Sequence, residues 1–244
     1  MFVMKQNIIA IGGGDIASGK TLAIDKEIVN SVRVAGIQKP EVLFIPTASS
    51  DSKMYSQVII TYFKKLGCSV DVLNVLIEKL TFEHIKTKIL AAHIVYVGGG
   101  NTLKMMRIWR RFRIDTLLEQ ARARGTVLCG ISAGSICWFK HGNSDSRKFK
   151  NPDADYIKVT GLGFIDAFNC PHYDAEPERK ASLKKMLRKY SGVAIALDDW
   201  LRCRSKIIPI VLYVLLKAHM HIKCIGSWVF FTKKNLYPAH SFRV

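Results

Sequence analysis

GTVLCGISAGSICWFK, residues 125–140, is the stretch that decides the fold. An apolar run, residues 126–129, ends at Gly130, and a second apolar run begins at Ile136 after Ser132 and Gly134. This pattern predicts a strand, a sharp turn and the start of a helix. Glycines flank the serine because a Cβ would clash where the strand and the helix come close.

A serine on such a turn presents its hydroxyl at the end of the sheet, and the next backbone N–H, from Ala133, points toward an oxyanion formed there. Ser132 is therefore a candidate nucleophile. The alternative interpretation is a small-residue turn in which Ser132 only caps a helix.

Elsewhere in the chain, short apolar strands alternate with helical segments. The predicted strands are 7–11, 41–45, 69–76 and 92–97, and the predicted helices are 21–34, 55–66, 82–90, 102–112 and 114–123. This alternation is typical of a three-layer α/β fold with a mostly parallel, doubly wound sheet. Ligands bind such sheets at the carboxyl ends of the strands. Glycine-rich loops follow the first, fourth and fifth strands at that edge.

After residue 139 the order of elements is less regular. Residues 140–155 are predicted to form a long polar loop and residues 156–164 an extended segment. A helix over 178–190 and a strand over 193–197, ending at Asp198 and Asp199, follow.

Length and composition indicate one globular domain. The chain has 244 residues, of which 49% are hydrophobic, which is enough for a large core and excludes a mainly disordered chain. The net charge of +18 suggests an anionic partner, but residues 200–244 hold eight of the basic residues and no acidic ones. The other basic residues are spread over helical segments without an RNA-binding aromatic pattern, so we expect solvated faces and no nucleic acid partner.

The six cysteines form no C-x-x-C pair, so neither a zinc ribbon nor a redox motif is indicated, and no metal or cofactor is expected. The N-terminus lacks a signal-peptide layout, and the longest apolar stretch, 207–216, is too short to span a membrane. We expect a cytoplasmic protein that does not bind membranes.

A serine nucleophile needs a base within hydrogen-bond reach and a group that orients this base. Of the seven histidines, His172 is the best candidate, because it follows an extended segment and a proline and can return to the strand ends. His141 is nine residues beyond Ser132, which is too far along the predicted helix. The N–H groups of Gly99 and Gly100 are candidates for the second oxyanion donor. The residues alone leave the orienting acid open among Asp145, Asp153, Asp155, Asp166 and Asp174.

Four motifs together resemble the dipeptidase E family of serine peptidases, whose fold is similar to that of class I glutamine amidotransferases. They are IPTASS, VGGGNT, GISAGS and GLGFIDAFNCPHYD, and they occur in the family's order within residues 5–199. The resemblance implies Ser132 as nucleophile and His172 as base. It also implies an oxyanion hole formed by Ala133 with Gly99 or Gly100.

The family's acid lies in the loop after the serine, and Asp145 is its nearest match. The expected substrates are short peptides, including dipeptides with an N-terminal Asp, and no oligomeric state is implied. No arginine matches the family's specificity unambiguously; Asn101 and Arg179 are the candidate substrate-binding residues.

The resemblance ends near residue 199. We therefore expect a serine peptidase domain over 1–199 and an atypical basic and apolar segment over 200–244, which lacks acids and turn signals as a degenerate or frame-shifted end would.

Two other functions fit parts of the sequence. Gly14–Thr21 matches the phosphate-loop pattern G-x-x-x-x-G-K-T between a strand and a helix, with Lys20 as the phosphate ligand and Asp198 as a magnesium ligand. That alternative is nucleotide binding. The other is a catalytically silent binding domain on the same fold.

Overall fold

The computed structural model describes residues 7–190 and 193–199, and beyond them the backbone of 201–203, 206–208, 212–215, 221–224 and 229–231. Its largest element is a seven-stranded sheet in the order β13-β12-β1-β5-β4-β2-β3. The strands are β1 (Asn7–Ile11), β2 (Glu41–Ile45), β3 (Ser69–Val72), β4 (Ile94–Val97), β5 (Val127–Ile131), β12 (Leu212–Leu215) and β13 (His221–Cys224).

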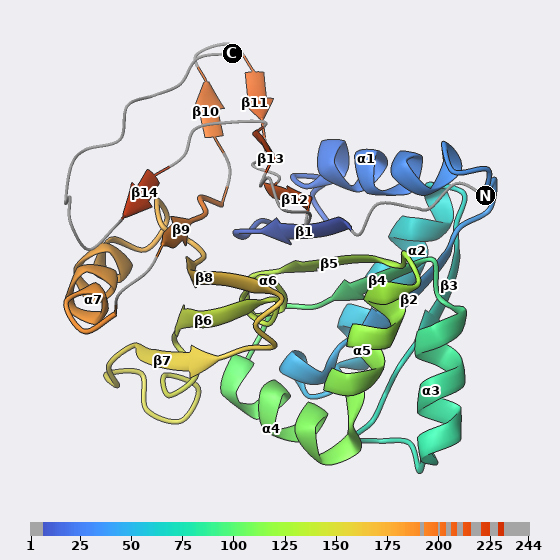
Figure 1. The fold of residues 1–244 in the computed structure, drawn as a ribbon, viewed down its shortest axis with the longest axis horizontal. Helices are drawn as coiled ribbons and strands as arrows, with labels where there is room; N and C mark the ends of the chain where they lie inside the picture. The colour runs from blue at the N-terminus through green and yellow to red at the C-terminus, as the bar shows by residue number, and fades with distance from the viewer. Residues whose placement is uncertain are drawn as a thin grey trace.

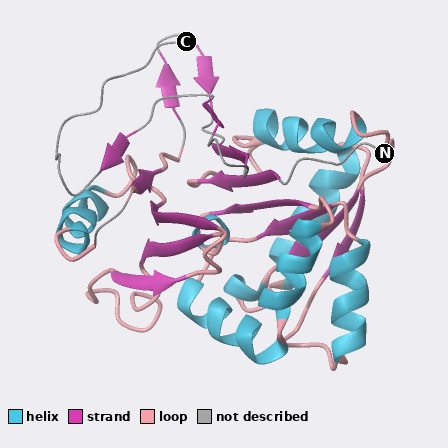
Figure 2. Ribbon diagram, viewed as in Figure 1, coloured by secondary structure: helices cyan, strands magenta, loops and turns pink. Residues whose placement is uncertain are grey.

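The five strands β1 to β5 run parallel to one another, while β12 pairs antiparallel with β1 and β13 antiparallel with β12. Helices cover both faces of this sheet (Figures 1 and 2). One face carries α1 (Leu22–Arg33) and α2 (Lys53–Lys65), and the other carries α3 (Phe82–Ala91), α4 (Thr102–Phe112) and α5 (Ile114–Ala123). The prediction of a three-layer, mostly parallel α/β fold is confirmed.

The hydrophobic core has two parts, one on each face of the sheet, because successive side chains of a strand point to opposite faces. In β1, Ile9 and Ile11 pack toward α1 and α2, whereas Ile8 and Ala10 pack on the opposite side. Successive side chains of a strand point to opposite faces, so a continuous apolar run is what a strand buried on both faces requires. Trp109 of α4 is fully buried on the second face and contributes one of the largest side chains of the core.

A second sheet adjoins the first, in the order β14-β9-β8-β6-β7. Its strands are β6 (Phe139–Ser144), β7 (Ile157–Thr160), β8 (Ile165–Cys170), β9 (Ala194–Ala196) and β14 (Val229–Phe231), and α7 (Pro177–Leu187) lies between β8 and β9 in the chain. β6, β8 and β9 run parallel.

Three local predictions around this second sheet are wrong, the first being the loop over 140–155, whose residues 140–144 belong to β6. The helix after Ser132, α6 (Ala133–Ile136), has only four residues, and the apolar residue Phe139 begins β6. Residues 165–170 form β8, for which no strand was predicted. Both segments owe their conformation to pairing with each other, which a local pattern does not reveal.

In the segment 200–244, the structure describes the backbone of β10 (Leu201–Cys203), β11 (Lys206–Ile208) and the three strands already named. β10 and β11 pair antiparallel. The side chains of this segment lie outside the described residues, so the prediction that it is atypical or degenerate stays a prediction.

Candidate active site

Ser132 lies at the carboxyl end of β5 with backbone angles that are unusual for a non-glycine residue, φ 55° and ψ −111°. Its N–H donates to the carbonyl oxygen of Ile11, at the end of the adjacent strand β1, over 3.0 Å. Backbone strain of this kind persists only where the surrounding structure holds it, and it is concentrated at functional sites.

The two glycines of the GISAG turn permit this geometry. A Cβ at Gly130 would overlap the carbonyl oxygen of Gly134, and a Cβ at Gly134 would overlap the carbonyl oxygen of Val97 on β4. The turn therefore packs against β5 and β4 at a separation that excludes any side chain at these two positions.

His172 is two residues beyond the end of β8, and its Nε2 lies 2.7 Å from Oγ of Ser132. The other ring nitrogen, Nδ1, contacts a carboxylate oxygen of Asp199. Because a carboxylate only accepts hydrogen bonds, Nδ1 carries the proton and Nε2 accepts the hydrogen bond of the Ser132 hydroxyl. The side chains of His172 and Asp199 are 19% and 18% exposed, and Ser132 is likewise only partly buried, so the site is in contact with solvent without being fully open.

Pairing between β8 and β9 explains why Asp199 reaches this histidine. The Cα atoms of Cys170 and Ala196 are partners in the parallel ladder, and the Tyr173 N–H donates to the Leu197 carbonyl oxygen just beyond it. His172 and Asp199 therefore follow the carboxyl ends of two neighbouring parallel strands and lie side by side.

Asp174 fixes the backbone of this turn, because its carboxylate accepts the N–H of Asp199 over 2.8 Å. Burial, reinforced by the carboxylates of Asp174 and Asp199, raises the pKa of the neighbouring Asp198 to about 6.

The predicted acid, Asp145, does not contact His172. One of its carboxylate oxygens lies 3.5 Å from Nη2 of Arg179, although Asp145 directly follows β6, which is parallel to β8. This geometry contradicts the prediction that Asp145 orients the histidine. None of the other predicted candidates takes its place, since the carboxylate on His172 Nδ1 belongs to Asp199.

Arg179 is 1% exposed and is held from several sides. It donates to the carboxylate of Glu176 and to the carbonyl oxygen of Asn143, and its guanidinium lies 4.9 Å from the ring centre of Tyr156. Burial raises the pKa of Glu176, but Arg179 and Tyr156 together lower it below its usual value. In this structure the guanidinium of Arg179 is buried and bonded to protein groups, and its substrate-binding role stays a prediction.

The loop after β4 lies against the serine. A Cβ at Gly99 would lie 3.5 Å from Cβ and 4.0 Å from Oγ of Ser132. Burial raises the pKa of the Tyr55 hydroxyl to about 12, and a hydrogen bond from the backbone of Gly99 opposes that rise. Gly98 and Asn101 use their N–H groups within the fold, on the carbonyl oxygens of Ile45 and Ala48.

The side chain of Asn101 is also engaged. It accepts the Lys104 N–H as the N-cap of α4 and donates to the Ser146 carbonyl oxygen. In this structure Asn101 therefore joins α4 to the loop after β6, and its substrate-binding role stays a prediction.

The first glycine loop serves the site in a way that sequence reasoning missed. A Cβ at Gly13 would overlap the imidazole of His172 and the carboxylate of Asp199, and one at Gly12 would overlap the carbonyl oxygen of Asp198. The glycines after β1 thus make room for the histidine–carboxylate pair.

The hydrogen bonds within residues 14–21 give the phosphate-loop alternative no support, and that alternative stays a prediction. The N–H groups of Gly19 and Lys20 donate to the carbonyl oxygens of Ile16 and Asp15, and the Ala17 N–H donates to the Asp15 carboxylate. These N–H groups, which a phosphate loop would offer to its ligand, are bonded within the loop itself.

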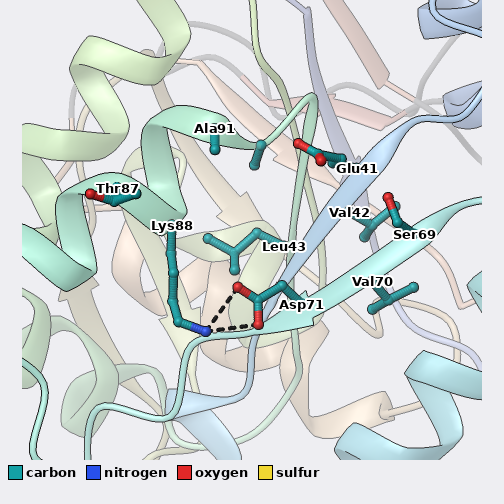
Figure 3. Close-up of a pocket in the computed structure, with 10 residues that line it drawn as sticks. Glu41, Val42, Leu43, Ser69, Val70, Asp71, Thr87, Lys88 and Ala91 are labelled. Atoms are coloured by element: carbon teal, nitrogen blue, oxygen red, sulfur yellow. Dashed lines mark hydrogen bonds and ion pairs between the residues drawn. The ribbon is translucent and has the colours of Figure 1, made fainter.

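A cavity of about 260 Å³ lies elsewhere, between α3 and the first residues of β2 and β3 (Figure 3). Lys88 reaches from α3 to both carboxylate oxygens of Asp71 on its wall. Because the parallel strands begin at this edge, the cavity is at the opposite edge of the sheet from Ser132 and takes no part in the site.

Among the residues that the structure describes, no group of three or more His, Cys, Asp or Glu side chains is arranged to hold a metal ion. No helix within the described ranges is long and apolar enough to cross a membrane.

A strained serine between strand and helix, hydrogen-bonded to a histidine that is held by a carboxylate, is the arrangement typical of serine hydrolases. Comparison with known proteins narrows this class. The profile of Peptidase family S51 matches residues 8–205. The chain is 34% identical over 198 residues to the uncharacterised peptidase YgaJ of Bacillus subtilis (strain 168). The aligned region covers 80% of this chain and 81% of YgaJ. It therefore belongs to peptidase family S51, and the resemblance to the dipeptidase E family is confirmed.

Solved structures agree in fold. A candidate peptidase E protein from Listeria monocytogenes EGD-e aligns with a TM-score of 0.63 at 19% identity, over 91% of this chain and all of that one. A peptidase from an acI-B1 actinobacterium aligns with a TM-score of 0.62 at 20% identity, over 94% of this chain and 98% of that one.

Proposed function

We propose that the protein is a serine peptidase that hydrolyses short peptides through an acyl-enzyme. The observation that carries the proposal is the 2.7 Å contact between Oγ of Ser132 and Nε2 of His172, with Asp199 on the other ring nitrogen. Membership of a peptidase family supports peptides as the substrate class.

In the proposed reaction, Ser132 Oγ attacks the peptide carbonyl carbon while His172 Nε2 takes the hydroxyl proton. The carboxylate of Asp199 stabilises the resulting imidazolium and keeps the ring in the required tautomer. His172 then gives the proton to the leaving amine, and the acyl group stays on Ser132 until a water molecule, deprotonated by the same nitrogen, releases it.

The tetrahedral intermediate carries its negative charge on the former carbonyl oxygen. The Ala133 N–H, which follows the nucleophile, is the first proposed donor to this oxygen. The loop of Gly99 and Gly100 is proposed to supply the second, through Gly100 while the Gly99 N–H stays on the Tyr55 hydroxyl. The position of Gly99 against Ser132 supports this assignment. Each such donor contributes roughly 3 to 4 kcal/mol to transition-state stabilisation in serine hydrolases.

The test is hydrolysis of a panel of dipeptides, Asp-Leu included, by the wild-type protein and by Ser132→Ala and His172→Ala variants whose fold is verified by circular dichroism. We expect turnover in the wild type and its loss in both variants. A fluorophosphonate probe gives a readout that does not depend on the substrate, and it should label the wild type but not Ser132→Ala. A well-folded wild type that neither cleaves peptides nor reacts with the probe would refute the proposal and favour a silent binding domain.

A further inference from the structure

A cleft of about 810 Å³ lies between the amino-terminal half of α4 and the loop that follows β6. Its volume is within the range of small-ligand sites. α4 also contacts the second sheet, at its edge strand β7 (both labelled in Figure 1). Its polar lining residues include Asn101, Lys104, Arg107, Ser146, Arg147 and Lys150.

All four ionisable residues of this lining are cations, and no carboxylate is among them. Lys104 donates to the Ser50 hydroxyl, whereas the side chains of Arg107, Arg147 and Lys150 make no hydrogen bond or ion pair with any described residue. Other lysines of the same surface are paired, as Lys148 is with Glu178. Unneutralised charges of one sign along a cleft concentrate its electrostatic field and attract ligands of the opposite sign.

The cleft and the loop that lies against Ser132 share a stretch of chain. Asn101, at its edge, is two residues from Gly99, which lies against Ser132. The Asn101 side chain and the Leu103 N–H both bond Ser146, at 2.9 Å each, and so fix the cleft wall to the first turn of α4. A peptide whose carbonyl group lies at Ser132 and whose chain follows the 99–101 loop would therefore enter the cleft.

We propose that this cleft binds acidic side chains of the substrate at positions away from the cleaved bond, so that acidic peptides longer than a dipeptide are preferred substrates. This inference rests on the proposed peptidase function. The apolar residues Leu103, Ile108 and Ala154 give the methylene groups of glutamate side chains a surface to pack on, while the cations bind the carboxylates.

The experiment measures binding to full-length Ser132→Ala protein, in which no turnover can occur. Fluorescence anisotropy compares a fluorescein-labelled glutamate-rich peptide with its glutamine-matched analogue at low and high salt. Arg107→Gln and Lys150→Gln are introduced singly and together. Arg111→Gln is the matched control, since Arg111 is exposed on the same helix but does not line the cleft.

We expect the glutamate-rich peptide to bind at least about tenfold more tightly than the glutamine analogue at low salt, with the difference shrinking at high salt. Each cleft substitution should weaken this binding about threefold and the pair about tenfold, with no change for Arg111→Gln. Equal binding of the two peptides, or an equal loss in Arg111→Gln, would overturn the proposal by showing that only overall charge matters.

A single-stranded oligonucleotide serves as the competing anion. If it binds more tightly than the peptide and loses affinity in the same two variants, the cleft recognises phosphates and the peptide assignment is wrong. Because binding is measured without the nucleophile, failure of the peptidase reaction would appear separately, as an absence of probe labelling in the wild type while peptide binding persists.

Discussion

Replacing Asp199 by asparagine tests which carboxylate completes the site. Asparagine has nearly the same shape, but its amide can turn an NH₂ group toward Nδ1 of His172. The imidazole proton then moves to Nε2, which can no longer accept the hydrogen bond from Ser132. Even if the amide oxygen faces Nδ1, the imidazolium formed in the reaction has lost the charge that stabilises it.

The expected loss for a substitution of this kind in a serine triad is about 10³- to 10⁴-fold in kcat. At about 1.4 kcal/mol for each factor of ten, this corresponds to roughly 4 to 5.5 kcal/mol of transition-state stabilisation. Asp145→Asn is the matched control, because the Asp145 carboxylate is 3.5 Å from Arg179 and does not contact His172. Its rate should stay within about threefold of the wild type, since a partly exposed ion pair contributes little.

The assay is the second-order rate constant of fluorophosphonate labelling, which reports nucleophile activation whatever the substrate is, followed by kcat on any dipeptide that the wild type cleaves. Circular dichroism and thermal unfolding check that each variant is folded. The assignment of Asp199 fails if Asp145→Asn loses as much activity as Asp199→Asn, or if Asp199→Asn labels at the wild-type rate.

Two further predictions concern the buried residues Gly13 and Asp25. Gly13→Ala should lower the labelling rate at least about 100-fold without unfolding the protein, because the new Cβ overlaps the His172–Asp199 pair; labelling near the wild-type rate would contradict this. Burial raises the pKa of Asp25, which is bonded to Tyr62, to about 6, so its ionisation destabilises the folded state as the pH rises. Between pH 5 and pH 8 the wild type should therefore lose roughly 1 to 2 kcal/mol of unfolding free energy relative to Asp25→Asn. Urea unfolding at each pH measures this difference. If the difference does not change with pH, Asp25 does not titrate in this range.

The features that could be predicted from the sequence are those that a local pattern of residues specifies. The strand, the strained serine and the flanking glycines are contiguous in residues 125–140, and the alternation of strands and helices specifies the parallel sheet. His172 could be selected because a proline and the end of an extended segment stand directly before it. These predictions needed no knowledge of which strands pair.

Asp199 could not be selected in the same way, because its position depends on the pairing of β8 with β9, which are separated in the chain by α7. A partial signal was present, since two aspartates end the strand that follows His172 in the chain. β8 itself went unrecognised, so nothing in the sequence indicated that this strand end lies beside the histidine. Asp145 is the acid that the family resemblance implies, but its carboxylate pairs with the buried Arg179.

The active site is divided between two sheets, and the glycine loop after β1 lies where the two parts meet. Ser132 belongs to the seven-stranded sheet, while His172 and Asp199 belong to the ends of β8 and β9 in the second sheet. A hydrogen bond of 2.7 Å across this junction tolerates little displacement of one sheet against the other. Gly13 lies in the loop after β1 of the first sheet, directly against His172 and Asp199. Because Gly13 has no side chain, this histidine–carboxylate pair can come close enough to bond the serine. The same loop leads into the residues that resemble a phosphate-binding motif, but this close approach accounts for Gly12 and Gly13, and the N–H groups of Ala17, Gly19 and Lys20 bond within the loop.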